Sequence, residues 1–317
     1  MSRSLSALLL SGLSICLLAA PLKAQVYEKT PELRGDIVVL PLTLINNYPF
    51  ISGAVNGVDG KFMFDTGFGA AISLNDNLIS LPHKKNKRDG VTGSGQVFRN
   101  SINDTVCEVR FANGPTYRNL ENVSSGNFDF LQKYVTPDFL GFIGQKFVKG
   151  YLIKFDYLDR KITLYKGSPE RDLSKDFLAN EKVLAVIGFE IRKLDNHPIV
   201  KLKINGIDVL GGFDSGQNGL LQLDAPSEKI LRSKRVVIPT DTDSNGDTLL
   251  TVRNIVLDGK FRTDLKGLES ATLDGTKVIR REGNITEPNL MTFGYRFMSQ
   301  YKTVWDYAQK KIYILEY

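Results

Sequence analysis

Two short acidic segments, Asp65-Thr66-Gly67 and Asp214-Ser215-Gly216, have the residue types needed for hydrolytic chemistry. Each aspartate follows an apolar run and precedes a glycine, the residue that most readily permits a tight turn. Two carboxyl groups held about 3 Å apart cannot both ionise, so they share one proton. The ionised group can then act as a general base on water while the protonated group polarises a carbonyl. Such a pair needs neither metal nor histidine, which suits a chain with only two histidines.

The two acidic segments lie at matching places in an internal repeat. In each copy a proline, Pro49 or Pro198, precedes the aspartate by 16 residues, and the copies are offset by 149 residues. Two later segments, 142–144 and 292–294, both end in an apolar residue and a glycine, with an offset of 150 residues. Because order, spacing and residue types all recur, the sequence indicates a duplication, with a period too long for a solenoid or propeller.

The repeat divides the chain into two similar lobes, at 35–166 and 183–317, with a connector at 167–182. The connector is rich in Gly, Ser, Pro and mixed charges, a composition typical of linkers. Within each copy the apolar runs are short and rich in β-branched and aromatic residues, and Asn-Gly pairs at 56–57 and 205–206 predict hairpin turns. The sequence therefore predicts a mostly β protein.

With these motifs the sequence resembles the aspartic peptidases, in the two-lobed arrangement with retroviral-protease-like (retropepsin/pepsin-type) halves. The resemblance covers nearly all of 35–317. It implies two β-barrel-like lobes with a cleft between them, in which both acidic loops meet and Asp65 and Asp214 form one catalytic dyad. The substrate class that it implies is a peptide or protein.

The resemblance also assigns supporting roles around the dyad. The threonine or serine of each loop is expected to hydrogen-bond across to the opposite loop, and the later segments at 143–144 and 293–294 are expected to pass behind the loops. The supporting residues of the catalytic loops are Thr66, Gly67, Ser215 and Gly216.

A glycine-rich segment follows the first aspartate by 27–30 residues and resembles the hairpin flap that covers the cleft in this family. Its expected substrate-binding residues are Gly93, Ser94 and Gly95. An ordinary glycine turn is the alternative interpretation. The same distance from the second aspartate leads to 242–246, where a second hairpin is expected.

The sequence departs from the family pattern directly after each motif, where Phe68 and Gln217 stand in place of the Ser or Thr of many two-lobed members. Retroviral-type halves commonly have Ala there, so the missing hydroxyl does not exclude activity. An aromatic ring at Phe68 is expected to remove water from the neighbouring carboxylate and raise its pKa. We therefore expect an activity optimum shifted toward mildly acidic or neutral pH.

The first 24 residues match a secretory signal peptide, with Arg3, an apolar run at 5–21 and a small residue at Ala24. A membrane anchor is the alternative, but the uncharged stretch is near the spanning minimum and rich in Ser, Gly and Ala. We therefore expect an exported protein, periplasmic or secreted, with no stable membrane span after cleavage. Cleavage leaves Cys107 as the only cysteine, so no internal disulfide can form.

Charge and composition restrict which other classes of partner, such as nucleic acids, cofactors and metal ions, the sequence predicts. Removal of Arg3 and Lys23 with the leader lowers the formal charge of +6 by two, to +4, which is too small to indicate nucleic acid. No cofactor is expected, and no metal site. The segment 241–247 matches the first half of a calcium loop, but Val252 stands where the bidentate Glu is needed, and a polar hairpin tip explains it as well. His197, at the repeat position of a tyrosine, is interpreted as structural.

Three functions are compatible with these sequence features. The first is an exported aspartic endopeptidase that acts as a monomer, since one chain carries both acidic loops. The second is a catalytically inactive aspartic-protease-like protein that binds extended peptides in the cleft. The third is a self-associating structural protein.

Overall fold

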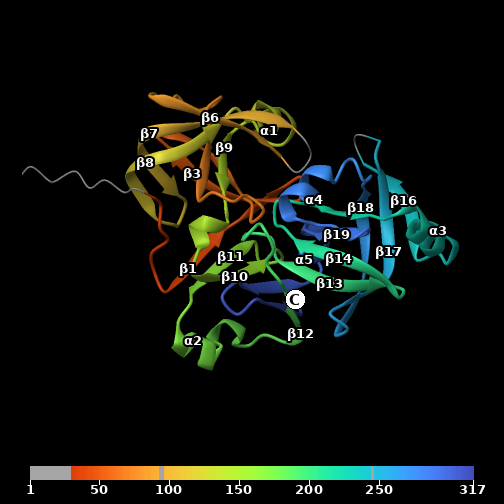
Figure 1. The fold of residues 1–317 in the computed structure, drawn as a ribbon. Coiled ribbons are helices and arrows are strands. Elements are labelled where there is room, and N and C mark those ends of the chain that lie inside the picture. The colour runs from red at the N-terminus through yellow and green to blue at the C-terminus, as the bar shows by residue number, and fades with distance from the viewer. Residues whose placement is uncertain (1–29, 93–95, 244–245) are drawn as a thin grey trace, which may run out of the picture.

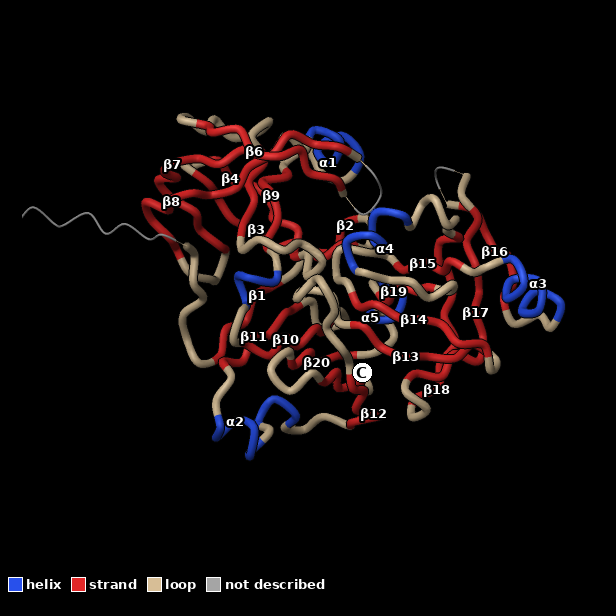
Figure 2. Tube along the Cα trace, viewed as in Figure 1, coloured by secondary structure: helices blue, strands red, loops and turns tan. Residues whose placement is uncertain are grey.

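The computed structural model describes residues 30–92, 96–243 and 246–317 (Figure 1). The leader predicted at 1–24 and the flap residues Gly93, Ser94 and Gly95 lie outside the described residues. The rest of the chain forms two β-rich lobes that lie side by side above a shared sheet (Figure 1). Strands dominate and the helices are short, as Figure 2 shows. The predicted mostly β, two-lobed architecture is confirmed.

The N-terminal lobe contains β2 (Thr43–Ile45), β3 (Tyr48–Val55), β4 (Val58–Phe64), β5 (Ile72–Asn75), β6 (Lys84–Val91), β7 (Val97–Phe111), β8 (Thr116–Gly126), α1 (Asp129–Tyr134), β9 (Phe139–Ile143) and η1 (Gln145–Val148). Its eight strands follow the order β2-β3-β4-β9-β5-β8-β7-β6. A further pairing of β3 with β7 curls this sheet toward a barrel.

The C-terminal lobe repeats this plan with β13 (Ile199–Ile204), β14 (Ile207–Phe213), β15 (Gly219–Gln222), α3 (Ala225–Ser233), β16 (Val237–Thr242), β17 (Thr248–Leu257), β18 (Phe261–Ser270), α4 (Lys277–Gly283), β19 (Leu290–Phe293) and α5 (Tyr295–Met298). Its seven strands follow the order β13-β14-β19-β15-β18-β17-β16, and β13 also pairs with β17. From β3 and β13 onward, the two orders match strand for strand, as expected from a duplication.

A third sheet joins the lobes. It consists of β1 (Ile37–Pro41), β10 (Tyr151–Asp156), β11 (Lys161–Lys166), β12 (Val183–Gly188), β20 (Lys302–Asp306) and β21 (Lys311–Leu315), in the order β1-β11-β10-β20-β21-β12. The antiparallel pairing of β10 with β20 joins the two copies at the centre. The segment predicted as a connector contains α2 (Pro169–Ser174) and η2 (Asp176–Leu178) beside this sheet (Figure 1).

The predicted Asn-Gly turns close matching hairpins in the two lobes. Asn56 and Gly57 join β3 to β4 with φ values of 49° and 83°, and Asn205 and Gly206 join β13 to β14 with 47° and 90°. Both residues of each pair have positive φ, which is the backbone that a two-residue hairpin of type I′ requires. The second strand of each hairpin, β4 or β14, directly precedes one of the two acidic segments.

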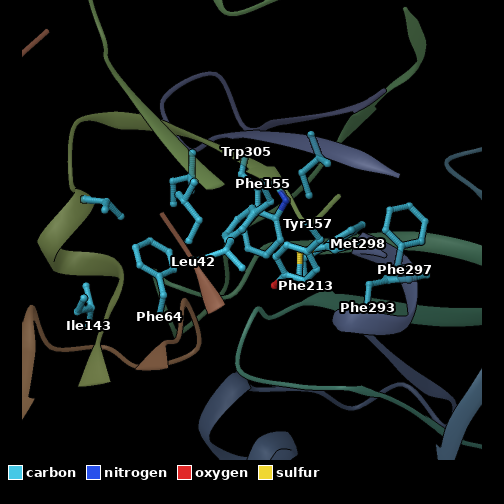
Figure 3. Close-up of a cluster of buried hydrophobic side chains, with 14 of the residues drawn as sticks. Leu42, Phe64, Ile143, Phe155, Tyr157, Phe213, Phe293, Phe297, Met298 and Trp305 are labelled. Carbon is cyan, nitrogen blue, oxygen red and sulfur yellow. The ribbon is translucent and has the colours of Figure 1, made fainter. Parts of the chain in front are cut away.

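A chain of four aromatic rings links the residues that directly precede the two acidic segments, and Figure 3 shows these rings in the core. Phe64 meets Phe155 at 5.9 Å between ring centroids, Phe155 meets Trp305 at 4.9 Å, and Trp305 meets Phe213 at 5.6 Å. All four side chains are buried. Phe64 and Phe213 directly precede the two aspartates, so this core fixes the position of one loop relative to the other.

Largely buried charges tie the connector to the central sheet. Lys154 on β10 pairs with Glu181, and Lys302 on β20 lies 3.0 Å from Glu181 and 3.4 Å from Asp156. Burial by itself raises the pKa of Glu181, but the hydrogen bonds from Lys154 and Lys302 outweigh it and hold that pKa below its ordinary value. The network therefore joins residues from both lobes and from the connector.

No helix in the described part of the chain is long and apolar enough to cross a membrane.

Candidate active site

Both predicted catalytic loops begin where a central strand ends. Asp65 follows β4 and Asp214 follows β14, and each of these strands has a parallel neighbour, β9 or β19. The amide of Asp65 donates to the carbonyl of Ile143 at 2.9 Å, and the amide of Asp214 donates to the carbonyl of Phe293 at 3.0 Å. The parallel neighbours therefore hold both loops in equivalent positions.

The two loops bind one another through Thr66 and Ser215. The Thr66 amide donates to Ser215 Oγ at 3.0 Å, and the Ser215 amide donates to Thr66 Oγ1 at 3.0 Å. Ser215 Oγ in turn donates to the carbonyl of Phe64 at 2.8 Å. Both side chains have no solvent exposure. This reciprocal pairing is the arrangement that the resemblance implied for these residues.

The glycines of the two motifs bring the carboxylates together. The amides of Gly67 and Gly216 donate to Asp214 Oδ1 at 3.2 and 2.8 Å, and the amide of Phe68 donates to Asp65 Oδ1 at 3.1 Å. A Cβ atom at Gly67 would lie 2.8 Å from Oδ1 of Asp214, and one at Gly216 would lie 2.6 Å from Oδ2 of Asp65. Each glycine thus faces the opposite aspartate at a distance that admits no side chain.

The environment of Asp65 favours its protonated form. Burial is the largest cause that raises the pKa of Asp65 well above its ordinary value, followed by the charge of Asp214 and a hydrogen bond shared with Asp214. Hydrogen bonds from the amides of Gly67 and Phe68 act in the opposite direction but are outweighed. A carboxyl pair in which one member keeps its proton is the state required for acid–base hydrolysis.

The segments at 143–144 and 293–294 lie directly behind the loops, as the resemblance implied. The amide of Gln145 donates to the Phe68 carbonyl at 3.0 Å, and that of Tyr295 donates to the Gln217 carbonyl at 2.9 Å. A Cβ atom at Gly144 or Gly294 would collide with the same carbonyl groups. Only glycine therefore lets these segments approach the loops so closely.

Phe68 has a packing role in the cleft. Its ring stacks on Phe142 with a centroid distance of 5.0 Å and an interplanar angle of 11°. It also packs against the buried cluster of the N-terminal lobe that contains Phe50, Met63 and Phe128. The ring thus forms one apolar wall beside Asp65, while Gln217 occupies the corresponding position in the other loop.

A cavity of about 190 Å³ opens at the two aspartates. Asp65, Asp214, Phe68 and Thr92, at the base of the expected flap, all line it. His197 lines it as well, with a buried Nδ1 that has no hydrogen-bond partner among the described residues. The sequence did not predict that His197 would border the cleft; its interpretation as structural stays a prediction.

Sequence reasoning did not identify Asn196, which crosses from the second lobe to the first loop. Its side-chain amide donates to the carbonyls of Thr66 at 3.3 Å and Gly67 at 2.5 Å, and the residue is buried. Tyr48 was also missed. Burial raises its pKa to about 12, helped by the negative charges of Glu269, Asp214 and Asp65. The repeat paired the segments that contain Asn196 and Tyr48, and this was the only signal that pointed to them.

The described residues contain no group of three or more His, Cys, Asp or Glu side chains that could hold a metal ion. At the tip of the hairpin between β16 and β17, the Asp243 amide donates to the Asp247 carbonyl at 2.9 Å. The Asp247 amide donates to Asp243 Oδ1 at 2.8 Å. The carboxylate of Asp243 thus closes the turn.

Comparison with known proteins gives a structural match. The crystal structure of basic 7S globulin from soybean matches with a TM-score of 0.52, over 88% of this chain and 95% of that chain, at 10% sequence identity. No family model matches the chain, and no curated protein does. At this identity the similarity concerns the fold. The chain therefore has the two-lobed, pepsin-like fold of the aspartic proteases.

Proposed function

We propose that this protein is an exported aspartic endopeptidase in which Asp65 and Asp214 activate a water molecule. The observation that carries the proposal is the reciprocal pairing of Thr66 with Ser215, which holds the two carboxylates against one another. The raised pKa of Asp65 supports it, because the pair then keeps one proton to higher pH. No cofactor is needed for this chemistry.

The residues of the two loops account for each step. The ionised carboxylate removes a proton from water, and the resulting oxygen nucleophile attacks the scissile carbonyl. The protonated carboxyl polarises that carbonyl and then helps to protonate the leaving nitrogen. The amides of Gly67 and Gly216 donate to Asp214 Oδ1 and stabilise negative charge on Asp214 whenever its carboxyl group is ionised. The pair titrates as a unit, so it is the dyad that holds the single proton.

Digestion of a diverse peptide library between pH 3 and pH 8, with and without a statine-type inhibitor, tests the proposal. We expect cleavage that the inhibitor blocks and that Asp65→Asn and Asp214→Asn each abolish, with unchanged circular dichroism. Absence of cleavage at every pH, with peptide binding that survives both substitutions, would support the inactive peptide binder instead. Export is tested separately, by the N-terminal sequence of the mature protein, which we expect to begin near Gln25.

A further inference from the structure

Equivalent positions of the two lobes differ in size at the cleft. In the N-terminal lobe, Met63 on β4 pairs with Phe50 on β3 and with Phe142 on β9. In the C-terminal lobe, the same places on β14, β13 and β19 hold Gly212, Ile199 and Thr292. Three large side chains in one copy thus correspond to Ile, Gly and Thr in the other.

The large side chains fill their own lobe. Phe50, Met63 and Phe142 are 0%, 3% and 7% exposed, and they pack with Phe128 and Phe139 in one buried cluster. No space for a ligand side chain remains at the position of Met63. The N-terminal half of the cleft therefore presents a closed aromatic wall.

The small residues leave the corresponding space open in the C-terminal lobe. Gly212 and Thr292 line the cavity of about 190 Å³ next to the aspartates, and a Cβ atom at Gly212 would meet nothing within 4 Å. Apart from the polar His197 and Gln217, most of the remaining wall on this side is aliphatic and comes from β13, β14, β19 and the region of α4. Its aliphatic part consists of Ile199, Leu210, Ile279, Ile285 and Leu290.

We propose that Gly212 and Thr292 open a one-sided specificity pocket that takes a bulky apolar side chain of the substrate from one side of the scissile bond only. The proposal rests on the proposed function. An apolar cavity of about 150 Å³ in a protein core can hold benzene, and the cleft cavity of about 190 Å³, which both lobes line, is of similar size. On the other side of the bond, the packed Phe50, Met63 and Phe142 favour a small residue.

The test uses four peptides in which a reduced bond replaces the scissile amide, with Trp or Ala at each flanking position. We expect Trp on one side to tighten binding about 10- to 100-fold over Ala, the usual range for added apolar groups in a hydrophobic pocket. Trp on the other side is expected to give no gain. Binding is measured by calorimetry on the full-length protein.

Gly212→Met, which copies Met63 of the first lobe, fills the pocket and is expected to remove the preference. The matched control is Gly188→Met on β12, an exposed strand position that lies outside the cavity and where a Cβ atom also meets nothing within 4 Å. It should keep the preference. Thr292→Phe, which copies Phe142, provides a second filling variant should Gly212→Met not fold.

The outcomes separate this inference from the proposed function, because cleavage of the unreduced peptides is followed in parallel. One-sided binding without cleavage would support the pocket and contradict the peptidase. Cleavage with equal preferences on both sides would overturn the pocket and leave the peptidase intact. Failure of all four reduced peptides to bind, or a preference that persists in a folded filling variant, would also overturn the pocket.

Discussion

The two motif glycines leave no room for a side chain beside the opposite aspartate. A Cβ atom at Gly67 would lie 2.8 Å from a carboxylate oxygen of Asp214, so Gly67→Ala must push the two loops apart. We expect a loss of stability of about 1–3 kcal/mol, the usual cost of overpacking, and loss of cleavage. Urea unfolding and peptide cleavage measure both effects. Gly69→Ala is the control, because position 69 is exposed with open space around it, and it should behave like the unchanged protein.

Thr66 provides a second test at this scale. Thr66→Val keeps the shape of the side chain but removes the oxygen that accepts the buried Ser215 amide at 3.0 Å. An unsatisfied buried donor costs about 1–3 kcal/mol, so we expect a decrease of that size in the free energy of unfolding. Thr43→Val, on an exposed position of β2, should change it by less than about 0.5 kcal/mol. Equal effects for the two variants would contradict the role of Thr66.

The raised pKa of Asp65 predicts a pH dependence of stability with a definite sign. In the pH range between the ordinary carboxyl pKa and the raised pKa, the folded protein binds the proton and the unfolded chain has released it. The contribution of Asp65 to the free energy of unfolding is therefore fully present below about pH 4, and it is lost as pH rises through the folded pKa. We expect the difference in unfolding free energy, unchanged protein minus Asp65→Asn, to decrease from pH 4 to pH 7. The exposed Asp274→Asn should show no such trend.

At the residue scale, the sequence was sufficient to predict the site residues that recur in both copies. It was insufficient for residues whose role depends on contacts between the copies. The duplicated motifs identified Asp65 and Asp214, and the structure places them together. Asn196 escaped notice because its partners are carbonyls 129 and 130 residues away, and any residue type can supply a carbonyl. The buried, unpartnered Nδ1 of His197 likewise depends on which elements border the cavity.

At the scale of elements, the charge network around Glu181 links the connector to β10 and β20. The pKa of Glu181 is lowered in the folded protein. Its contribution to the free energy of unfolding is therefore present above about pH 4.5 and is lost as pH falls through the folded pKa. Glu181→Gln leaves two lysines without their shared carboxylate, and we expect a loss of about 3 kcal/mol at pH 7. The difference from the unchanged protein should shrink as the pH is lowered to 2. Glu316→Gln, which disrupts an exposed pair with Lys182, should cost less than about 1 kcal/mol.

The elements that could be predicted from the sequence are those whose backbone is determined by residues close together in the chain. Asn-Gly pairs fix the hairpins at 56–57 and 205–206 by their backbone preference, whatever surrounds them. The central sheet could not be predicted in this way, because β10 pairs with β20, which lies about 150 residues later in the chain. Phe155, for example, pairs with Thr303. Spacing in the sequence does not specify which edges of two similar copies will meet.

At the scale of the whole molecule, the duplication explains both the common plan and the asymmetry. Strand order is shared from β3 and β13 onward, and the aromatic contact between Phe155 and Trp305 joins the two copies in the core (Figure 3). The sequence predicted two lobes, but it did not predict that one six-stranded sheet would belong to both. The lobes therefore depend on each other, and the copies differ at Met63, which is buried, and Gly212, which lines the cleft cavity.

The joined lobes also determine how activity should depend on concentration. Both aspartates come from one chain, and the reciprocal bonds of Thr66 and Ser215 are formed within it. A second copy would supply nothing that the dyad lacks, so we expect the active species to be a monomer of about 35.4 kDa or less after removal of a leader. Size-exclusion chromatography with light scattering gives the mass, and cleavage per mole of protein should stay constant over a hundredfold dilution. Activity that declines on dilution in step with dissociation of a dimer would mean that a partner chain completes the site.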